Sequence, residues 1–121
     1  MTLMPEDDIA TVRAWCTDRV PAHARKQVLV ECEVTDRHVT IVERRLPYQA
    51  DRPDSNATVP ASEWTRLPIA RLRYVRTRAE WTVYWRDRHQ RFHRHIHIPP
   101  TVAVTDLLEV LDRNPGGIFW G

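Results

Sequence analysis

The spacing of apolar residues changes twice along this chain, and the two changes restrict the folds that it can adopt. Near the amino terminus, apolar side chains recur every three or four residues and stop at Pro21, which is the pattern of a helix with one buried face. The residues of this stripe are Ile9, Val12, Cys16 and Val20. The same spacing returns in Val104, Leu107, Leu108 and Leu111 and stops at Asn114-Pro115-Gly116-Gly117. We therefore expect one helix near each end of the chain.

Between the two expected helices, apolar residues alternate with polar ones, which is the period of a strand with one buried face. Residues 27–34 and 39–44 alternate in this way and are separated by a short polar turn, so they are expected to form an antiparallel hairpin. Residues 69–75, 81–86 and 91–98 alternate as well and are joined by short polar connections. This pattern predicts a meander of three strands.

The segment from residue 46 to residue 62 separates the hairpin from the meander and has no apolar period. It contains Pro47, Pro53 and Pro60 among aspartate, serine and asparagine residues, a composition typical of surface loops. Loops of this length inside a compact domain are uncommon and are often functional. We therefore expect a long loop over residues 46–62.

In chain order, these segments predict an α+β fold: a helix, a two-strand hairpin, a long loop, a three-strand meander and a second helix. The strands are expected to form a five-stranded antiparallel sheet with both helices on one face, since such a sheet can bury one side and expose the other. At 121 residues the chain has the size of one ordinary domain, so residues 1–121 are expected to be a single domain. The second face of the sheet is then free for function.

The charge balance of the chain limits the partners that it can have. Its 18 basic and 16 acidic residues leave a formal net charge of +2, an excess too small to make the whole molecule a ligand for polyanions. An anion site would therefore depend on where the arginines gather. The first residues do not have the pattern of a leader, and no apolar run approaches the roughly 18 residues that a membrane span requires. We expect a cytoplasmic protein with no membrane partner.

Arginine and aromatic residues gather in the predicted meander. The residues that we select as a candidate binding surface are Arg71, Arg73, Tyr84, Trp85, Arg86 and Arg88. Guanidinium groups bind phosphates through paired hydrogen bonds, and exposed rings stack on unpaired bases. A sheet face with both groups predicts a non-enzymatic module that binds nucleic acid or another phosphorylated ligand. The alternative is that the rings lie in the core and that the arginines pair with acidic neighbours around it.

Histidines alternate along the last predicted strand. His93 and His95 would project in the same direction, and such a pair can hold a metal ion if another element supplies a further ligand. The alternative is that these histidines are polar residues of a solvent-exposed face. Cys16 and Cys32 have neither a redox nor a zinc-ligand spacing and are expected to be small buried residues.

The sequence contains no motif of an enzyme or of a cofactor site. The sheet can bring Glu43, Asp87 and His93 together as a catalytic group, but carboxylates and histidines are common surface residues. We therefore assign no catalytic residue and expect no cofactor. A further alternative to ligand binding is a homodimer that uses Trp81, Trp85 or the loop around Tyr48.

Several short segments, which are spread over nearly the full length of the chain, together have residues typical of one known family. They are Glu43-Arg44-Arg45 with Pro47, the segment from Pro68 to Tyr74, Trp81, the segment from Tyr84 to Arg88, His93 and Phe119-Trp120-Gly121. In these segments the chain resembles the bacterial DUF3024 family of uncharacterised proteins. The resemblance implies a bacterial single-domain protein and supplies no mechanism.

Overall fold

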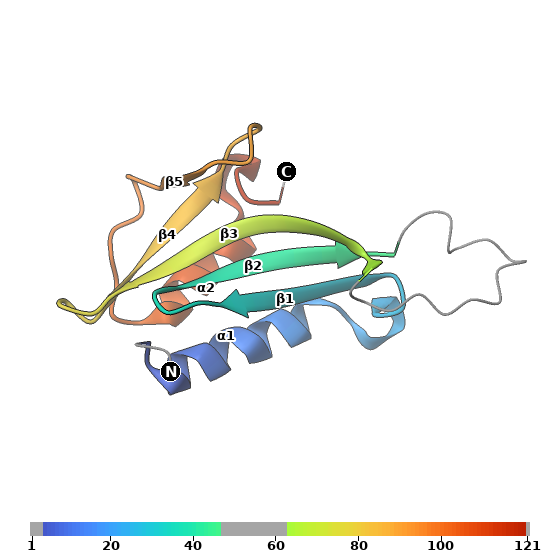
Figure 1. Cartoon of the computed structure of the whole chain (residues 1–121), viewed down its shortest axis with the longest axis horizontal. Helices are drawn as coiled ribbons and strands as arrows, with labels where there is room; N and C mark the ends of the chain where they lie inside the picture. Colours follow the sequence, from blue (N-terminus) through green and yellow to red (C-terminus); the bar gives the residue numbers. More distant parts are fainter. Residues whose placement is uncertain (1–3, 47–62, 121) are drawn as a thin grey trace, which may run out of the picture.

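The computed structural model describes residues 4–46 and 63–120, in which helices and strands follow the predicted order (Figure 1). The elements are α1 (Glu6–Arg19), η1 (Ala22–Ala24), β1 (Val28–Val34), β2 (His38–Arg45), β3 (Thr65–Val75), β4 (Glu80–Arg86), β5 (Phe92–Arg94), α2 (Val104–Arg113) and η4 (Pro115–Gly117). The strands form one antiparallel sheet in the order β1-β2-β3-β4-β5. The predicted α+β fold is confirmed. From residue 47 on, the expected loop over residues 46–62 lies outside the described residues.

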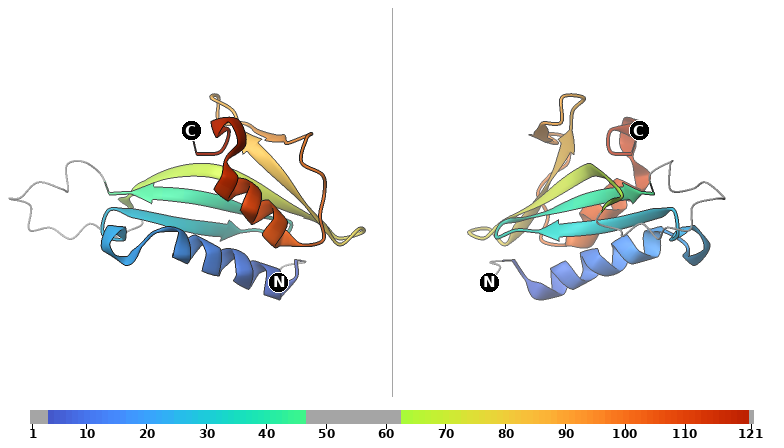
Figure 2. Two further views of the ribbon diagram at one scale, coloured as in Figure 1. Left: turned by 180° about the vertical axis from the view of Figure 1, so that it is seen from behind. Right: turned by 45° about the vertical axis from the view of Figure 1, so that its right-hand side comes forward.

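Both helices pack on the same face of the sheet, as predicted (Figure 2). The hydrophobic core joins Val12 of α1 and Leu111 of α2 to one set of alternate strand residues. The most deeply buried strand residues of this set are Val39, Ile41, Ala70, Leu72, Trp81 and Val83. Cys16 is buried in the same core, and Cys32 is partly buried against it. We call the opposite side of the sheet the open face, because neither helix lies over it.

Strand β3 is longer than the alternation predicted, since it begins at Thr65 and not at residue 69. Pro68 concealed this part of the strand in the sequence, because proline has no N–H to donate to a neighbouring strand. The sheet accommodates the proline with a bulge. Two adjacent residues of β2 lie opposite Ala70 and Pro68, so that Ile69 is an extra residue on β3. Ile69 is therefore buried in the core, whereas strict alternation would place it on the same face as Arg71.

Strand β5 is shorter than predicted and covers only Phe92–Arg94 of the expected residues 91–98. After β5 the chain forms a turn in which the Ile98 amide donates to the His95 carbonyl oxygen at 3.2 Å. The chain returns to the edge of β4 at Thr101, which exchanges backbone hydrogen bonds of 2.6 and 3.0 Å with Trp81. The two prolines just before Thr101 have no N–H, so they cannot extend the ladder between these points.

The apolar residues near the carboxyl terminus dock against the core. Asn114 has a left-handed backbone with φ 46°, which ends α2 and turns the chain back. Its Oδ1 accepts the amide N–H of Phe119 at 2.9 Å and that of Trp120 at 3.1 Å. The Trp120 indole donates to the Leu111 carbonyl oxygen at 2.8 Å, and the Arg19 guanidinium lies 4.2 Å from the centre of the Trp120 ring. The tail therefore links the end of α2 to α1.

We expect Phe119→Ala to destabilise the protein strongly, because it removes the buried anchor of this tail. Phe119 is 6% exposed, and truncation of a buried phenylalanine lowers the free energy of unfolding by about 3 kcal/mol or more. Urea denaturation followed by circular dichroism measures the loss. Ile96→Ala is the matched control: Ile96 is 81% exposed, and its truncation should change the free energy by less than about 0.5 kcal/mol. Equal losses in the two variants would contradict the docking of the tail.

Candidate functional site

The register of the sheet brings four of the predicted binding residues onto the open face. Cross-strand neighbours in β2, β3 and β4 are Thr40, Arg71 and Tyr84 in one row and His38, Arg73 and Thr82 in the next. Arg86 of β4 lies opposite Phe92 of β5. Because directly paired residues point to the same side of a sheet, these rows form one surface. That surface contains the predicted residues Arg71, Arg73, Tyr84 and Arg86.

Arg71 is held in position by its neighbours on the open face. Its Nε donates a hydrogen bond to Thr40 Oγ1 at 3.1 Å, and its guanidinium carbon lies 4.2 Å from the centre of the Phe92 ring. Partial burial lowers the pKa of Arg71 below its ordinary value, and the positive charge of Arg66 lowers it further. Arg71 therefore presents a fixed cation that no carboxylate of the described residues neutralises.

Acidic residues of β1 neutralise Arg44 of β2 and Arg66 of β3 on the open face, but not the arginines farther along β3 and in β4. Arg44 Nε donates to Glu31 at 2.8 Å, and Arg66 holds Glu33 through two nitrogens, of which Nε is at 2.8 Å. The hydrogen bonds from Arg66 lower the pKa of Glu33. The ion pairs of residues 4–46 and 63–120 do not include Arg71, Arg73 or Arg86. The alternative that the arginines pair with acidic neighbours therefore holds for Arg44 and Arg66 but not for Arg71, Arg73 and Arg86.

Three hollows follow one another along the open face. The central hollow has a volume of about 560 Å³, and its lining includes Arg37, His38, Arg71, Arg73, Tyr84 and Phe92. A second hollow, of about 520 Å³, shares Arg71 and Phe92 with it, and a third, of about 330 Å³, shares Arg37 and Arg73 with it. We call the arginines that line the three hollows the arginine track, which consists of Arg37, Arg66, Arg71, Arg73, Arg76 and Arg86.

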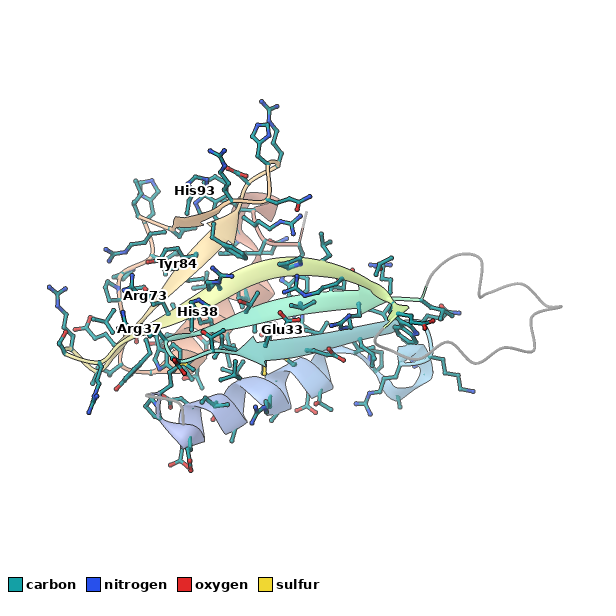
Figure 3. All side chains as sticks on the ribbon, viewed as in Figure 1. Glu33, Arg37, His38, Arg73, Tyr84 and His93 are labelled. Atoms are coloured by element: carbon teal, nitrogen blue, oxygen red, sulfur yellow. The ribbon has the colours of Figure 1, made fainter. Side chains whose placement is uncertain are left out.

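Two residues of the central hollow, Arg37 and His38, were not predicted from the sequence. Arg37 is exposed in the turn between β1 and β2, and its carbonyl oxygen accepts the N–H of Tyr74 at 2.9 Å, which holds the turn against β3. His38 begins β2 and lies opposite Arg73. Figure 3 shows Arg37, His38, Arg73 and Tyr84 gathered at one end of the sheet. The sequence signal for them was limited to a polar turn, because only the pairing of β2 with β3 brings them to the meander.

The structure does not bring Trp85 and Arg88, the other two selected residues, to this surface. Trp85 lies opposite Ala70 on the covered side and packs against the core, with its ring 4.9 Å from that of His93. Alternate residues of a strand point to opposite sides, so Trp85 cannot share a surface with Tyr84. Arg88 is exposed in the turn between β4 and β5, where its Nε donates to His89 Nε2 at 3.4 Å.

The two histidines selected as metal ligands have separate neighbours. His93 Nε2 lies 2.7 Å from Asp87 Oδ2, whereas the His95 ring lies 6.2 Å from the Phe119 ring and 6.1 Å from the His97 ring. In the part of the chain that the structure describes, no group of three or more histidine, cysteine, aspartate or glutamate side chains is arranged to hold a metal ion. The metal site therefore stays a prediction, and these contacts do not support it.

The residues considered for catalysis divide between two ion pairs. Glu43 accepts a hydrogen bond from Arg45 at 2.5 Å, and Asp87 pairs with His93. Asp87 also organises the turn between β4 and β5, because its Oδ1 accepts the N–H groups of His89 at 2.8 Å and Arg91 at 2.9 Å. The contact with His93, followed by these backbone hydrogen bonds, lowers the pKa of Asp87 from 3.8 to about 2.

The protein has an α+β fold in which helices cover one face of the antiparallel sheet and the arginine track lies on the other face. The chain belongs to the DUF3024 family, a domain of unknown function, which matches residues 2–121. No curated protein and no solved structure matches the chain. Within the described residues, no helix has the length and apolar character needed to cross a membrane. The function must therefore be inferred from the residues of the site.

We expect Asp87 to stabilise the fold near neutral pH but not in strong acid. Because its pKa in the folded protein lies below the ordinary value, its contribution is complete above about pH 4 and is lost as the pH falls toward about 2. Asp87→Asn should therefore lower the melting temperature at neutral pH and have a diminishing effect on acidification. Thermal unfolding over a pH series measures this.

Asp18→Asn is the control for Asp87→Asn. Asp18 is exposed on α1 and takes part in none of the ion pairs that the described residues form. Its substitution should leave the melting temperature almost unchanged at each pH. A difference between the wild type and Asp87→Asn that stays constant down to about pH 2 would show that the charge of Asp87 is not the stabilising factor.

Proposed function

We propose that this protein is a non-enzymatic binding module whose open sheet face holds a phosphorylated ligand, and that single-stranded nucleic acid is the ligand that this face suits best. The observation that carries the proposal is the position of Arg71 and Arg73, which are neighbours on the uncovered face and have no ion pair with a described carboxylate. Guanidinium groups at this spacing repel one another, and a bound anion relieves the repulsion.

The arrangement of the hollows supports a ligand with several phosphates. Neighbouring hollows share arginines, so consecutive phosphates of a strand would each meet a guanidinium group. Arg71 and Arg73 are alternate residues of β3, and such residues project from one face about 7 Å apart. Consecutive phosphates of a flexible single strand can adopt this spacing, and a planar guanidinium can bind each of them with two hydrogen bonds.

The rings of the central hollow favour a single strand over a duplex. Tyr84 is partly exposed and lines this hollow, and unpaired bases stack on such rings, whereas the bases of a duplex are already stacked on one another. The Phe92 ring is occupied by the Arg71 guanidinium. Phe92 therefore serves to position a cation, and Tyr84 is the ring available to a base.

The homodimer alternative has less support. Trp81, one of its proposed contact residues, has no exposed surface, so it cannot form part of an interface between subunits. Trp85 packs against the core of its own chain. Tyr48 lies outside the described residues.

We expect the protein to bind a labelled oligothymidylate with an affinity that falls steeply as salt increases. Counterion release predicts a slope of log affinity against log salt of about −0.7 for each phosphate contacted. Arg73→Ala should weaken binding and make the slope shallower. Arg113→Ala should change neither, because Arg113 is exposed on α2, on the covered side of the sheet. Fluorescence anisotropy over a salt series measures both quantities, and absence of binding at low salt would remove the proposed function.

The ring of Tyr84 should contribute to the same affinity. Stacking of a base on an aromatic side chain contributes about 1–3 kcal/mol, so Tyr84→Leu should weaken binding by about that amount. Tyr84→Phe keeps the ring and should bind almost as well as the wild type. The anisotropy titration with oligothymidylate compares the two variants. Equal losses would mean that the hydroxyl group, and not the ring, contacts the ligand.

A further inference from the structure

His38 is a titratable side chain in the lining of the central hollow. Its Nδ1 lies 2.7 Å from Thr35 Oγ1, and its Nε2 makes no hydrogen bond within the described residues. The same Thr35 hydroxyl oxygen lies 3.2 Å from the carbonyl oxygen of His38. The hydroxyl can thus donate to Nδ1 of a neutral ring, or donate to the carbonyl while it accepts an N–H from a protonated ring. Both charge states of His38 therefore keep a hydrogen bond at Nδ1 and leave Nε2 free for a ligand.

The surroundings of His38 disfavour its charged form in the free protein. Partial burial is the main cause that lowers the pKa of His38 below 6.5, and the charges of Arg71 and Arg73 lower it further. The charged and titratable groups that line the hollow around it are Asp36 and Arg37 from the turn, Arg71 and Arg73 from β3, and Tyr84 from β4. Asp36 is exposed, and Glu33 of the neighbouring strand is already held by Arg66. His38 is therefore neutral at pH 7 in the absence of an anion.

We propose that the central hollow is a phosphate subsite at which His38 takes up a proton when the ligand binds, so that its imidazolium joins Arg71 and Arg73 around the phosphate. This inference rests on the proposed function. A phosphate in the hollow offsets the two guanidinium charges and offers an acceptor oxygen to Nε2–H. Both effects favour the charged ring. The ligand is thereby bound more tightly when a proton is available, and binding and protonation strengthen each other by the same factor.

The direction of the pH dependence follows from this coupling. His38 loses its proton at a lower pH in the free protein than in the complex. Between these two pH values the complex holds one more proton than the free protein, so the affinity rises as the pH falls, by at most about tenfold per pH unit. At higher pH the ring is neutral in both states, and at lower pH it is charged in both, so the affinity no longer depends on His38.

The test uses a labelled oligothymidylate of about ten residues that has no terminal phosphate monoester and whose dye does not titrate between about pH 5.5 and about pH 8. Neither its phosphodiesters nor its bases titrate between about pH 5.5 and about pH 8, so a change in affinity over that range reports on the protein. Fluorescence anisotropy at constant ionic strength should show wild-type affinity at least about threefold higher at the lower pH. His38→Gln should bind with nearly the same affinity at both pH values. His89→Gln, which changes an exposed histidine in the β4–β5 turn, should keep the wild-type pH dependence.

The outcomes separate this inference from the function on which it rests. Binding that is equally pH-dependent in the wild type and in His38→Gln would overturn the role of His38 and leave nucleic-acid binding standing. Loss of the pH dependence in His89→Gln as well would also overturn it. A wild-type protein that does not bind at any pH would remove both proposals.

A second measurement does not depend on a variant that must fold. The ring resonances of His38 in the wild-type protein can be followed by NMR over the same pH range, with and without the oligothymidylate. The midpoint of the titration should move to higher pH when the ligand is present. A midpoint that is unchanged or lower would overturn the proposed proton uptake.

Discussion

The antiparallel register of β2, β3 and β4 is the constraint on which the open face depends. It sets Arg71 beside Thr40 and Tyr84, and it sets Arg73 beside His38 and Thr82. The cross-strand neighbours of both arginines are therefore side chains with hydroxyl groups or rings. Carboxylates at these positions would neutralise the two guanidinium charges. A slip of one residue would exchange the two faces, turning the guanidinium groups toward the core and Leu72 toward solvent. The burial of the apolar residues on the covered side thus holds the arginines on the open side.

A single bulge extends this surface along β3. Arg66 and Arg71 are an odd number of residues apart, so strict alternation would put them on opposite faces. The extra residue Ile69 reverses the alternation, and both arginines line the second hollow. Glu33 pairs with Arg66 at one end of that hollow, whereas Arg71 and Arg86, which line the same hollow, have no ion pair within the described residues.

The sequence predicted the parts of this structure that depend on local patterns. Alternation along each strand was sufficient to predict the fold class. It was also sufficient to place Arg71 and Arg73 on one face of their strand and Leu72 on the other face. It was not sufficient for the bulge, because Pro68 reads as a strand breaker until a neighbouring strand is known. Nor was it sufficient for Arg37 and His38, which reach the site only through the pairing of β2 with β3. Trp85 was misplaced for a different reason: it was selected for its ring, although alternation already put it on the face opposite Tyr84.

The turn between β4 and β5 connects the stability of the sheet edge to the geometry of the site. The Asp87 carboxylate fixes that turn through hydrogen bonds with His89, Arg91 and His93. The turn then places Phe92 opposite Arg86. The Phe92 ring then carries the Arg71 guanidinium at 4.2 Å. A carboxylate that never reaches the hollows therefore helps to position the central cation of the arginine track. Asp87 and His93 are both among the residues that carry the family resemblance, and in the structure their contact lies in the turn that leads to the edge strand whose Phe92 ring supports Arg71.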